Sequence, residues 1–352
     1  MKLDMNYSVS ARDVLTNPEM GARFDMMRRA GVNRIWLEGY FYGHHETAPE
    51  DIARARTRIL DAGFESGIIS LPVGHPGNSL NPDDPTLELR IPDSWRYRID
   101  KNGNPVYFCA DIDDTMIRDN TEAARVYAQM GFDMSFFDDD LRMGNWGKET
   151  QGCFCSDCIA RFNERFGLRE TRDTLRARID AEKEGAPDPD GILNMWRKFN
   201  CDKVTDLMVK THIDGQRSGI MVMHDGDERH GISIPDIRRA LPDCMFRVGE
   251  AHFSDADYAV PGGRASVARS ISHHLKLIGD CDAYSESTVF PARALSPENL
   301  LDKIRLELSL GLRHIFLMAG TWFLSEPYWK AIADNREALS EFAAALDEAK
   351  EK

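Results

Sequence analysis

Apolar positions along the chain follow two patterns, one typical of short buried strands and one typical of amphipathic helices. Strand-like runs occupy 2–10, 32–38, 64–73, 132–137, 220–223, 245–248, 282–285 and 314–318. Helix-like segments occupy 17–31, 49–63, 115–131, 159–218 with an interruption at 185–191, 234–241, 263–279, 297–311, and 326 to the end. Strands that alternate with helices predict a parallel sheet, and eight strand–helix pairs are the number found in a closed (β/α)8 barrel.

The alternation pauses after the third predicted strand. Residues 76–114 are rich in Pro and Gly, and the pair Asn102-Gly103 predicts the turn of a hairpin within them. We therefore expect an insertion at this point of the barrel, carrying Cys109. The pattern contains no short repeat, low-complexity tract or linker that would separate a second unit, so it predicts a single barrel domain over 1–352.

Composition narrows the possible partners. The chain has 352 residues with 42% hydrophobic and 29% charged residues, which is typical of soluble globular proteins. Its net charge of -14 argues against nucleic acid and anionic membranes as partners, since both repel an acidic surface. The N-terminus lacks the apolar core of a signal peptide, and no apolar run is long enough to span a bilayer. We expect a cytoplasmic protein, and the sequence leaves open whether it forms a homo-oligomer.

Acidic residues follow two of the predicted strands. The fourth strand ends in three consecutive carboxylates, Asp138, Asp139 and Asp140, and Glu286 ends the seventh between two serines. A solvated charge run or a helix cap is the alternative interpretation, but the triplet directly follows an apolar strand. Strand ends four and seven lie on opposite sides of a barrel mouth, where two carboxylates can face each other across a bound sugar.

A second candidate site is a cysteine cluster in the loop after strand four. Cys153, Cys155 and Cys158 form a Cys-x-Cys-x2-Cys pattern, and a tetrahedral zinc site needs one more ligand. Cys109 is the nearest other cysteine in the sequence, so a structural zinc would staple two long loops of the catalytic face. Free or buried thiols are the alternative, although the loop is polar. The remaining thiols are expected in the core: Cys201, Cys244 and Cys281.

The chain resembles the catalytic barrel of glycoside hydrolase family 42, the zinc-containing β-galactosidases of clan A. The four cysteines match the order and spacing of that family's zinc ligands. Phe137–Leu141 occupies the place of the family's Asp-Asn-Glu-Tyr strand end. Glu286, with the proline-containing loop and the segment GLRHIFL that follow it, matches the nucleophile strand and the approach to strand eight.

The resemblance implies a retaining glycosidase with Glu286 as nucleophile and Asp140 as acid/base, and it places Asp139 on the family's asparagine. The family's Asn-Glu pair is Asp-Asp in this chain, and the family's later domains do not follow the barrel. The shorter Asp side chain widens the expected gap between the two carboxyl groups, so inversion stays open beside retention. Galactoside specificity does not carry over.

Other polar groups near predicted strand ends could bind substrate, with loop packing as the alternative role for each. They are Glu38, Tyr40, His75, His224, Glu250, His252 and Trp322. Two other functions remain open. His224, Asp225, Glu250 and His252 could serve a metal-dependent barrel lyase or isomerase, and the Asp-for-Glu change is compatible with a carbohydrate-binding barrel without turnover.

Overall fold

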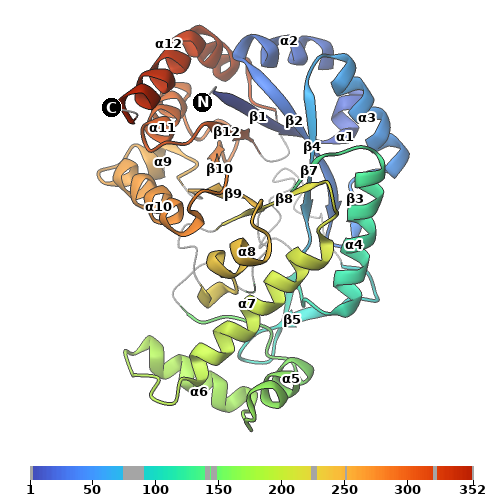
Figure 1. Cartoon of the computed structure of the whole chain (residues 1–352), viewed down its shortest axis with the longest axis vertical. Coiled ribbons are helices and arrows are strands. Elements are labelled where there is room, and N and C mark those ends of the chain that lie inside the picture. Colours follow the sequence, from blue (N-terminus) through green and yellow to red (C-terminus); the bar gives the residue numbers. More distant parts are fainter. Residues whose placement is uncertain are drawn as a thin grey trace.

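The predicted strands form a closed parallel barrel (Figure 1). The computed structural model describes residues 3–73, 91–138, 143, 149–222, 228–249, 252–319 and 323–350. The barrel strands in chain order are β1 (Asp4–Val9), β2 (Val32–Phe41), β4 (Glu65–Leu71), β7 (Met134–Phe137), β8 (Arg217–Met221), β9 (Met245–Val248), β10 (Ala283–Ser285) and β12 (His314–Met318). β1 pairs with both β2 and β12, which closes the ring. The predicted (β/α)8 barrel is confirmed.

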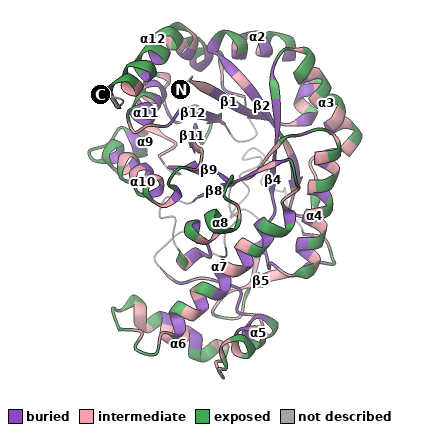
Figure 2. Ribbon diagram, viewed as in Figure 1, coloured by how far each residue is buried: buried purple, intermediate pink, exposed green. Residues whose placement is uncertain are grey.

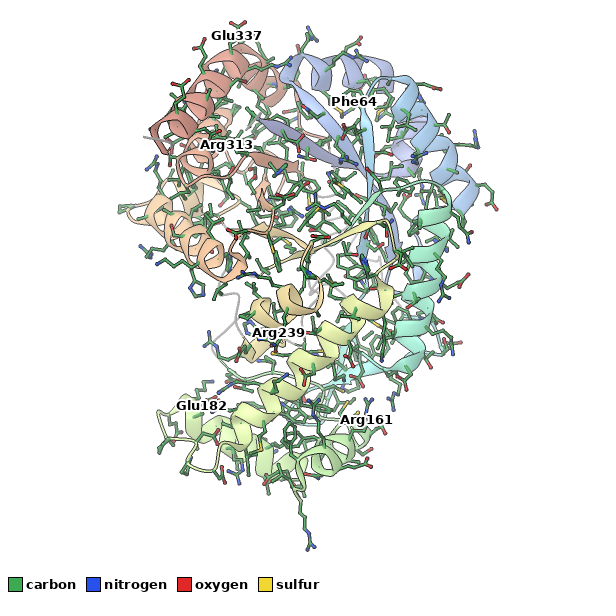
Figure 3. All side chains as sticks on the ribbon, in the orientation of Figure 1. Phe64, Arg161, Glu182, Arg239, Arg313 and Glu337 are labelled. Atoms are coloured by element: carbon green, nitrogen blue, oxygen red, sulfur yellow. The ribbon has the colours of Figure 1, made fainter. Side chains whose placement is uncertain are left out.

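Helices surround the barrel and bury one stripe each. They are α2 (Met20–Ala30), α3 (Pro49–Asp61), α4 (Asp114–Gln129), α7 (Ile192–Thr211), α8 (Ile234–Ala240), α10 (Gly263–Ile278), α11 (Pro297–Ser309) and α12 (Glu326–Lys350). In α3, Ile52, Ala55 and Ile59 are buried at helical spacing, and Figure 2 shows such stripes facing the strands. Glu337 of α12 points away from the barrel (Figure 3). Among the described helices, none combines the length and the apolar character needed to cross a membrane.

Several short elements lie in the connections between the barrel strands and the surrounding helices. The predicted hairpin exists as β5 (Tyr97–Ile99) and β6 (Pro105–Ala110), and its turn glycine, Gly103, adopts φ of 93°. The other short elements were not predicted from the sequence: α1 (Ala11–Thr16), β3 (His44–His45), η1 (Glu228–His230), α9 (Asp255–Tyr258) and β11 (Ser287–Thr288). None of them is longer than six residues, which is too short for a repeating pattern of apolar positions to be recognised in the sequence.

The long helical region after the cysteine loop divides into three helices. α5 (Ser156–Phe166) and α6 (Arg172–Lys183) form, with the first turns of α7, a lobe that projects from the barrel, and Figure 3 places Arg161 and Glu182 on it. The rings of Phe154, Phe162, Trp196 and Phe199 pack at its centre with centroid separations of 4.9–5.8 Å.

The expectation that helix continues to residue 218 is wrong. α7 ends at Thr211, and Gly215 adopts φ of 84° in a turn closed by the bond from Gln216 N to Ile213 O. The fifth strand therefore begins at Arg217, three residues before its predicted start at residue 220.

Aromatic side chains fill the barrel interior. Trp36, Phe136, Tyr284 and Phe316 are at most 2% exposed and pack with one another, with Met245 in the same cluster. Such large rings fit because glycine occupies neighbouring inward positions. A Cβ atom on Gly67 would lie 2.3 Å from Cε3 of Trp36, and one on Gly219 would lie 2.4 Å from Cε1 of Phe136.

This close approach predicts a stability difference between two glycine substitutions. Gly67→Ala forces a methyl group into the Trp36 ring and should lower the free energy of unfolding by about 1–3 kcal/mol or more. Gly21→Ala is the control, because Gly21 lies on the exposed face of α2 with nothing within 4 Å of the added Cβ, and it should raise stability by about 0.5–1 kcal/mol. Urea unfolding of both variants measures the difference, and a Gly67→Ala protein as stable as wild type would contradict the packing.

Candidate functional site

The alternation of side chains along the strands brings charged residues into the mouth of the barrel. Trp36, Phe136, Met245 and Tyr284 face the interior, and the residue two positions later on each strand points the same way. These later residues are Glu38, Asp138, Arg247 and Glu286. They come from strands two, four, six and seven, and all lie toward the C-terminal ends of the strands, where barrel enzymes carry their active sites.

Arg247 joins the ends of strands four and seven. Its Nη1 atom binds Oδ1 of Asp138 and its Nη2 atom forms an ion pair with Oε2 of Glu286. Its guanidinium carbon lies 4.6 Å from the centre of the Phe316 ring. Asp138 is positioned independently by the bond from its backbone N–H to Ser70 O, 3.0 Å long. Because two carboxylates bind neighbouring nitrogens of one guanidinium, they lie close together in the same mouth.

Glu286 is buried, with 2% of its surface exposed. Burial raises the pKa of Glu286 to about 7, because the ionised form loses its water; Arg247 opposes this rise and Asp138 adds to it. The hydroxyl of Thr288 donates a hydrogen bond to Oε1 of Glu286 and also lowers its pKa. The side chain is thus held at both oxygens, one by Arg247 and one by Thr288.

Glu38 lies among other carboxyl groups on the opposite side of the mouth. Burial, together with charge repulsion from Glu46, Asp13 and Asp138, raises the pKa of Glu38 to about 8. Arg247 is already shared by Asp138 and Glu286. A pKa of about 8 favours the protonated form of Glu38 at neutral pH, and this form offers a hydrogen-bond donor where an ionised carboxylate could only accept.

Of the other predicted substrate residues, the structure describes only Tyr40 and His252. The ring of Tyr40 packs against His45 and Trp95 and borders an enclosed cavity of about 20 Å³ between the strands and α4. His252 follows β9 with φ of 62°. The remaining candidates lie outside the described residues: Asp139, Asp140, His75, His224, Asp225, Glu250 and Trp322. Their proposed roles stay predictions.

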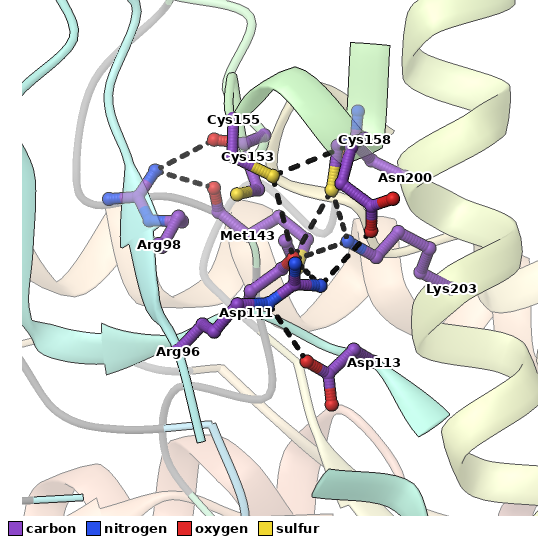
Figure 4. Close-up of polar contacts among 12 residues, drawn as sticks. Arg96, Arg98, Asp111, Asp113, Met143, Cys153, Cys155, Cys158, Asn200 and Lys203 are labelled. Carbon is purple, nitrogen blue, oxygen red and sulfur yellow. Dashed lines mark hydrogen bonds and ion pairs between the residues drawn. The ribbon is translucent and has the colours of Figure 1, made fainter. Parts of the chain in front are cut away.

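The cysteine cluster includes a carboxylate that sequence reasoning did not single out. Ligand atoms of Asp111, Cys153, Cys155 and Cys158 all lie within 4.8 Å of one another. Cys158 Sγ lies 3.2 Å from Asp111 Oδ2, and the backbone N–H of Cys158 donates to Cys155 Sγ, which caps the N-terminus of α5 (Figure 4). A buried carboxylate so close to several thiols is a donor set that suits a metal ion.

Positive side chains surround this cluster. Lys203 of α7 forms a buried ion pair with Asp111 Oδ1, and its Nζ atom lies 3.3 Å from Cys158 Sγ. Arg161 lies 3.7 Å from Cys158 Sγ, and Arg96 lies 3.8 Å from Asp111 Oδ2. Hydrogen bonds among the thiols lower the pKa of Cys155 and raise that of Cys153. The three cations around the cluster favour negative charge on it, as metal-binding thiolates require.

Cys109 lies buried on β6, two residues before Asp111. The residue that lies close to all three clustered cysteines is Asp111, so the structure offers a carboxylate as an alternative fourth ligand to Cys109. The assignment of Cys109 as the fourth ligand stays a prediction. A signal for Asp111 was present in the sequence, because it shares the stretch CADIDD with Cys109.

Comparison with known proteins supports the fold and leaves the family open. The chain is similar to the solved structure of Gan42B, a GH42 β-galactosidase, with a TM-score of 0.63 and 13% sequence identity. The match covers 98% of this chain and 57% of the other, so the chain spans little more than half the length of that enzyme. No protein-family model and no curated protein matches the sequence. The likeness therefore shows the (β/α)8 barrel fold, and membership of family 42 stays a prediction.

Proposed function

We propose that this protein is a glycoside hydrolase that acts on a carbohydrate with Glu286 as its nucleophile. The observation that carries the proposal is the pairing of Asp138 and Glu286, from the ends of strands four and seven, on the single guanidinium of Arg247. A glycosidase needs carboxyl groups from two sides of one cleft, and this arrangement brings carboxyl groups from two separate strand ends to the same part of the barrel mouth.

The surroundings of Glu286 suit a nucleophile. A carboxylate attacks only when it is ionised, and it attacks best when water does not cover it. Burial removes that water, while Arg247 and Thr288 favour the ionised form and fix both oxygens. With its pKa at about 7, Glu286 is ionised in a growing fraction of molecules as the pH rises through neutrality.

Asp138 is a poor choice for the acid, because its ion pair with Arg247 favours the ionised state. We propose Asp140 as the acid/base, in line with the family resemblance. On a strand, Asp140 shares a face with Asp138, so the negative charge of Asp138 would help to keep Asp140 protonated. Glu38, protonated at neutral pH, is proposed to donate a hydrogen bond to a sugar hydroxyl.

We also propose that the cysteine cluster holds a structural zinc ion. Three thiolates and a fourth anionic ligand fill a tetrahedral site and leave no open position for water, so the ion would stabilise the loops and not join the chemistry. With zinc bound, such a ligand set carries a net charge of about -2. Lys203, Arg161 and Arg96 would offset this charge.

One prediction of the proposed function concerns turnover of aryl glycosides. Glu286→Gln and Asp140→Asn should each lower kcat by about 10³-fold or more, because each removes one of the two reacting carboxyl groups. In wild type, kcat/KM should fall as the pH drops below about 7, since Glu286 becomes protonated. Azide should restore activity to Glu286→Ala with a product of inverted configuration if the enzyme is retaining.

Glu65→Gln is the matched control for turnover. Glu65 begins β4 at the N-terminal face of the barrel and pairs with Arg34 there, so its loss should leave turnover unchanged. Wild-type rates in both active-site variants would refute the assignment. Saturable sugar binding without turnover in wild type would favour a carbohydrate-binding barrel, and activity abolished by chelator with the fold intact would favour a metal-dependent lyase or isomerase.

A further prediction concerns metal content. Protein prepared without chelator should contain about one zinc per chain, with Zn–S distances near ~2.3 Å by X-ray absorption. Cys155→Ser and Cys158→Ser should lose the zinc and lower Tm, whereas Cys244→Ala, which changes a buried thiol next to β9, should retain it. Comparing Cys109→Ser with Asp111→Asn identifies the fourth ligand. Absence of zinc from wild type would contradict the proposal.

A further inference from the structure

The backbone of strand seven is interrupted at Glu286. β10 ends at Ser285 and β11 begins at Ser287, and β12 pairs separately with each piece. At the break, the backbone N–H of Phe316 donates to the hydroxyl of Ser285 over 3.0 Å. Glu286 therefore sits at a point where the strand ladder alone does not fix the chain.

Two charged side chains of α11 lie directly behind this break. Lys303 and Glu307 are one helical turn apart and both are 0% exposed. Lys303 Nζ donates to the main-chain oxygen of Glu286 over 2.7 Å and to that of His252 over 3.4 Å. Glu307 accepts a 2.7 Å hydrogen bond from Ser287 Oγ, which in turn lies 2.7 Å from Ser285 Oγ.

Packing does not account for these charges. The same face of α11 buries Leu300, Ile304 and Leu308, so apolar residues fill this helix–strand interface on either side. Removing an ammonium group and a carboxylate from water is costly, and apolar residues of similar volume often serve stability equally well. Among the described residues, Lys303 donates to the main chain of Glu286 and of His252, and Glu307 accepts from Ser287. These contacts link both charges to the segment around Glu286.

We propose that Lys303 is a positioning residue for Glu286, with Glu307 as its counter-charge and as the anchor of the flanking serines. Lys303 holds the main chain from the helix side, while Arg247 and Thr288 hold the carboxylate from the barrel side. The buried ammonium also favours the ionised carboxylate. The consequence for turnover rests on the proposed function, whereas the effect on Glu286 itself does not.

The charges around Glu286 determine how its pKa should change when Lys303 is replaced. Burial raises its pKa most strongly, and Asp138 after β7 raises it further; Arg247 of β9 and Lys303 of α11 oppose the rise. Burial lowers the pKa of Lys303, and Glu307 opposes this by favouring its ionised form. Glu307 thus acts on Glu286 through Lys303. Removal of the Lys303 ammonium therefore raises the pKa of Glu286, and a nucleophile with a higher pKa needs a higher pH to become ionised.

The test measures the pKa of Glu286 by ¹³C NMR of protein labelled at the glutamate carboxyl carbon. The Glu286 signal is identified by its absence from Glu286→Gln. Lys303→Met and the double variant Lys303→Met/Glu307→Gln should both raise this pKa by about one unit or more. The double variant removes both buried charges together and keeps an amide near Ser287, so it avoids leaving one charge unpaired. Lys330→Met, which removes an exposed ammonium from α12, is the control and should leave the pKa unchanged.

Turnover provides a second readout. The acid limb of kcat/KM should move to higher pH by the same amount as the NMR pKa, with activity recovered on the alkaline side, whereas a purely structural defect lowers activity equally at every pH. A folded double variant with the wild-type pKa overturns the proposal, and so does failure of both variants to fold. Absence of glycosidase activity in wild type would refute the proposed function. The NMR measurement alone would then test the role of Lys303.

Discussion

The ion pairs of Arg247 determine how the mouth of the barrel is assembled. One fully buried guanidinium binds Asp138 from strand four and Glu286 from strand seven and stacks over Phe316 of strand eight. Burying these charges is costly, and loss of one partner would leave the others uncompensated, typically at about 3–5 kcal/mol. The charged residues at the ends of strands four, six and seven therefore form one electrostatic unit, and the orientation of Glu286 depends on all of them.

The layers of the barrel interior explain why such a unit can exist. Below the charged layer, the rings of Trp36, Phe136, Tyr284 and Phe316 fill the cross-section, with Gly67 and Gly219 making room for them. This aromatic floor keeps water from reaching the charges from beneath. The same exclusion raises the pKa values of Glu286 and Glu38, to about 7 and about 8, and so places their titration near neutral pH.

The sequence predicted the parts of this structure that depend on local pattern. Apolar strands, amphipathic helices and the Asn102-Gly103 turn are local signals, and Glu286 was recognisable because an acidic residue ends an apolar strand. Arg247 was missed, although a charged residue inside the strand MFRV is a signal, because its partners become neighbours only when the barrel closes. Asp111 and Lys203 meet across 92 positions in the chain, and Lys303 was hidden within a regular amphipathic helix. Contacts of this kind follow from tertiary structure and have no period in the sequence.

Three buried cations lie near strand or helix ends at the candidate sites. Arg247 serves the strand ends at the mouth, Lys303 serves the interrupted strand at Glu286, and Lys203 serves Asp111 and Cys158 in the cysteine cluster. Each binds anionic or carbonyl oxygens, or sulfur, at or next to the end of a strand or helix. Apolar side chains would fill these places at less electrostatic cost. The three buried charges are therefore better explained by a role in positioning Glu286, Asp138 and the cysteine loop than by a contribution to the stability of the barrel.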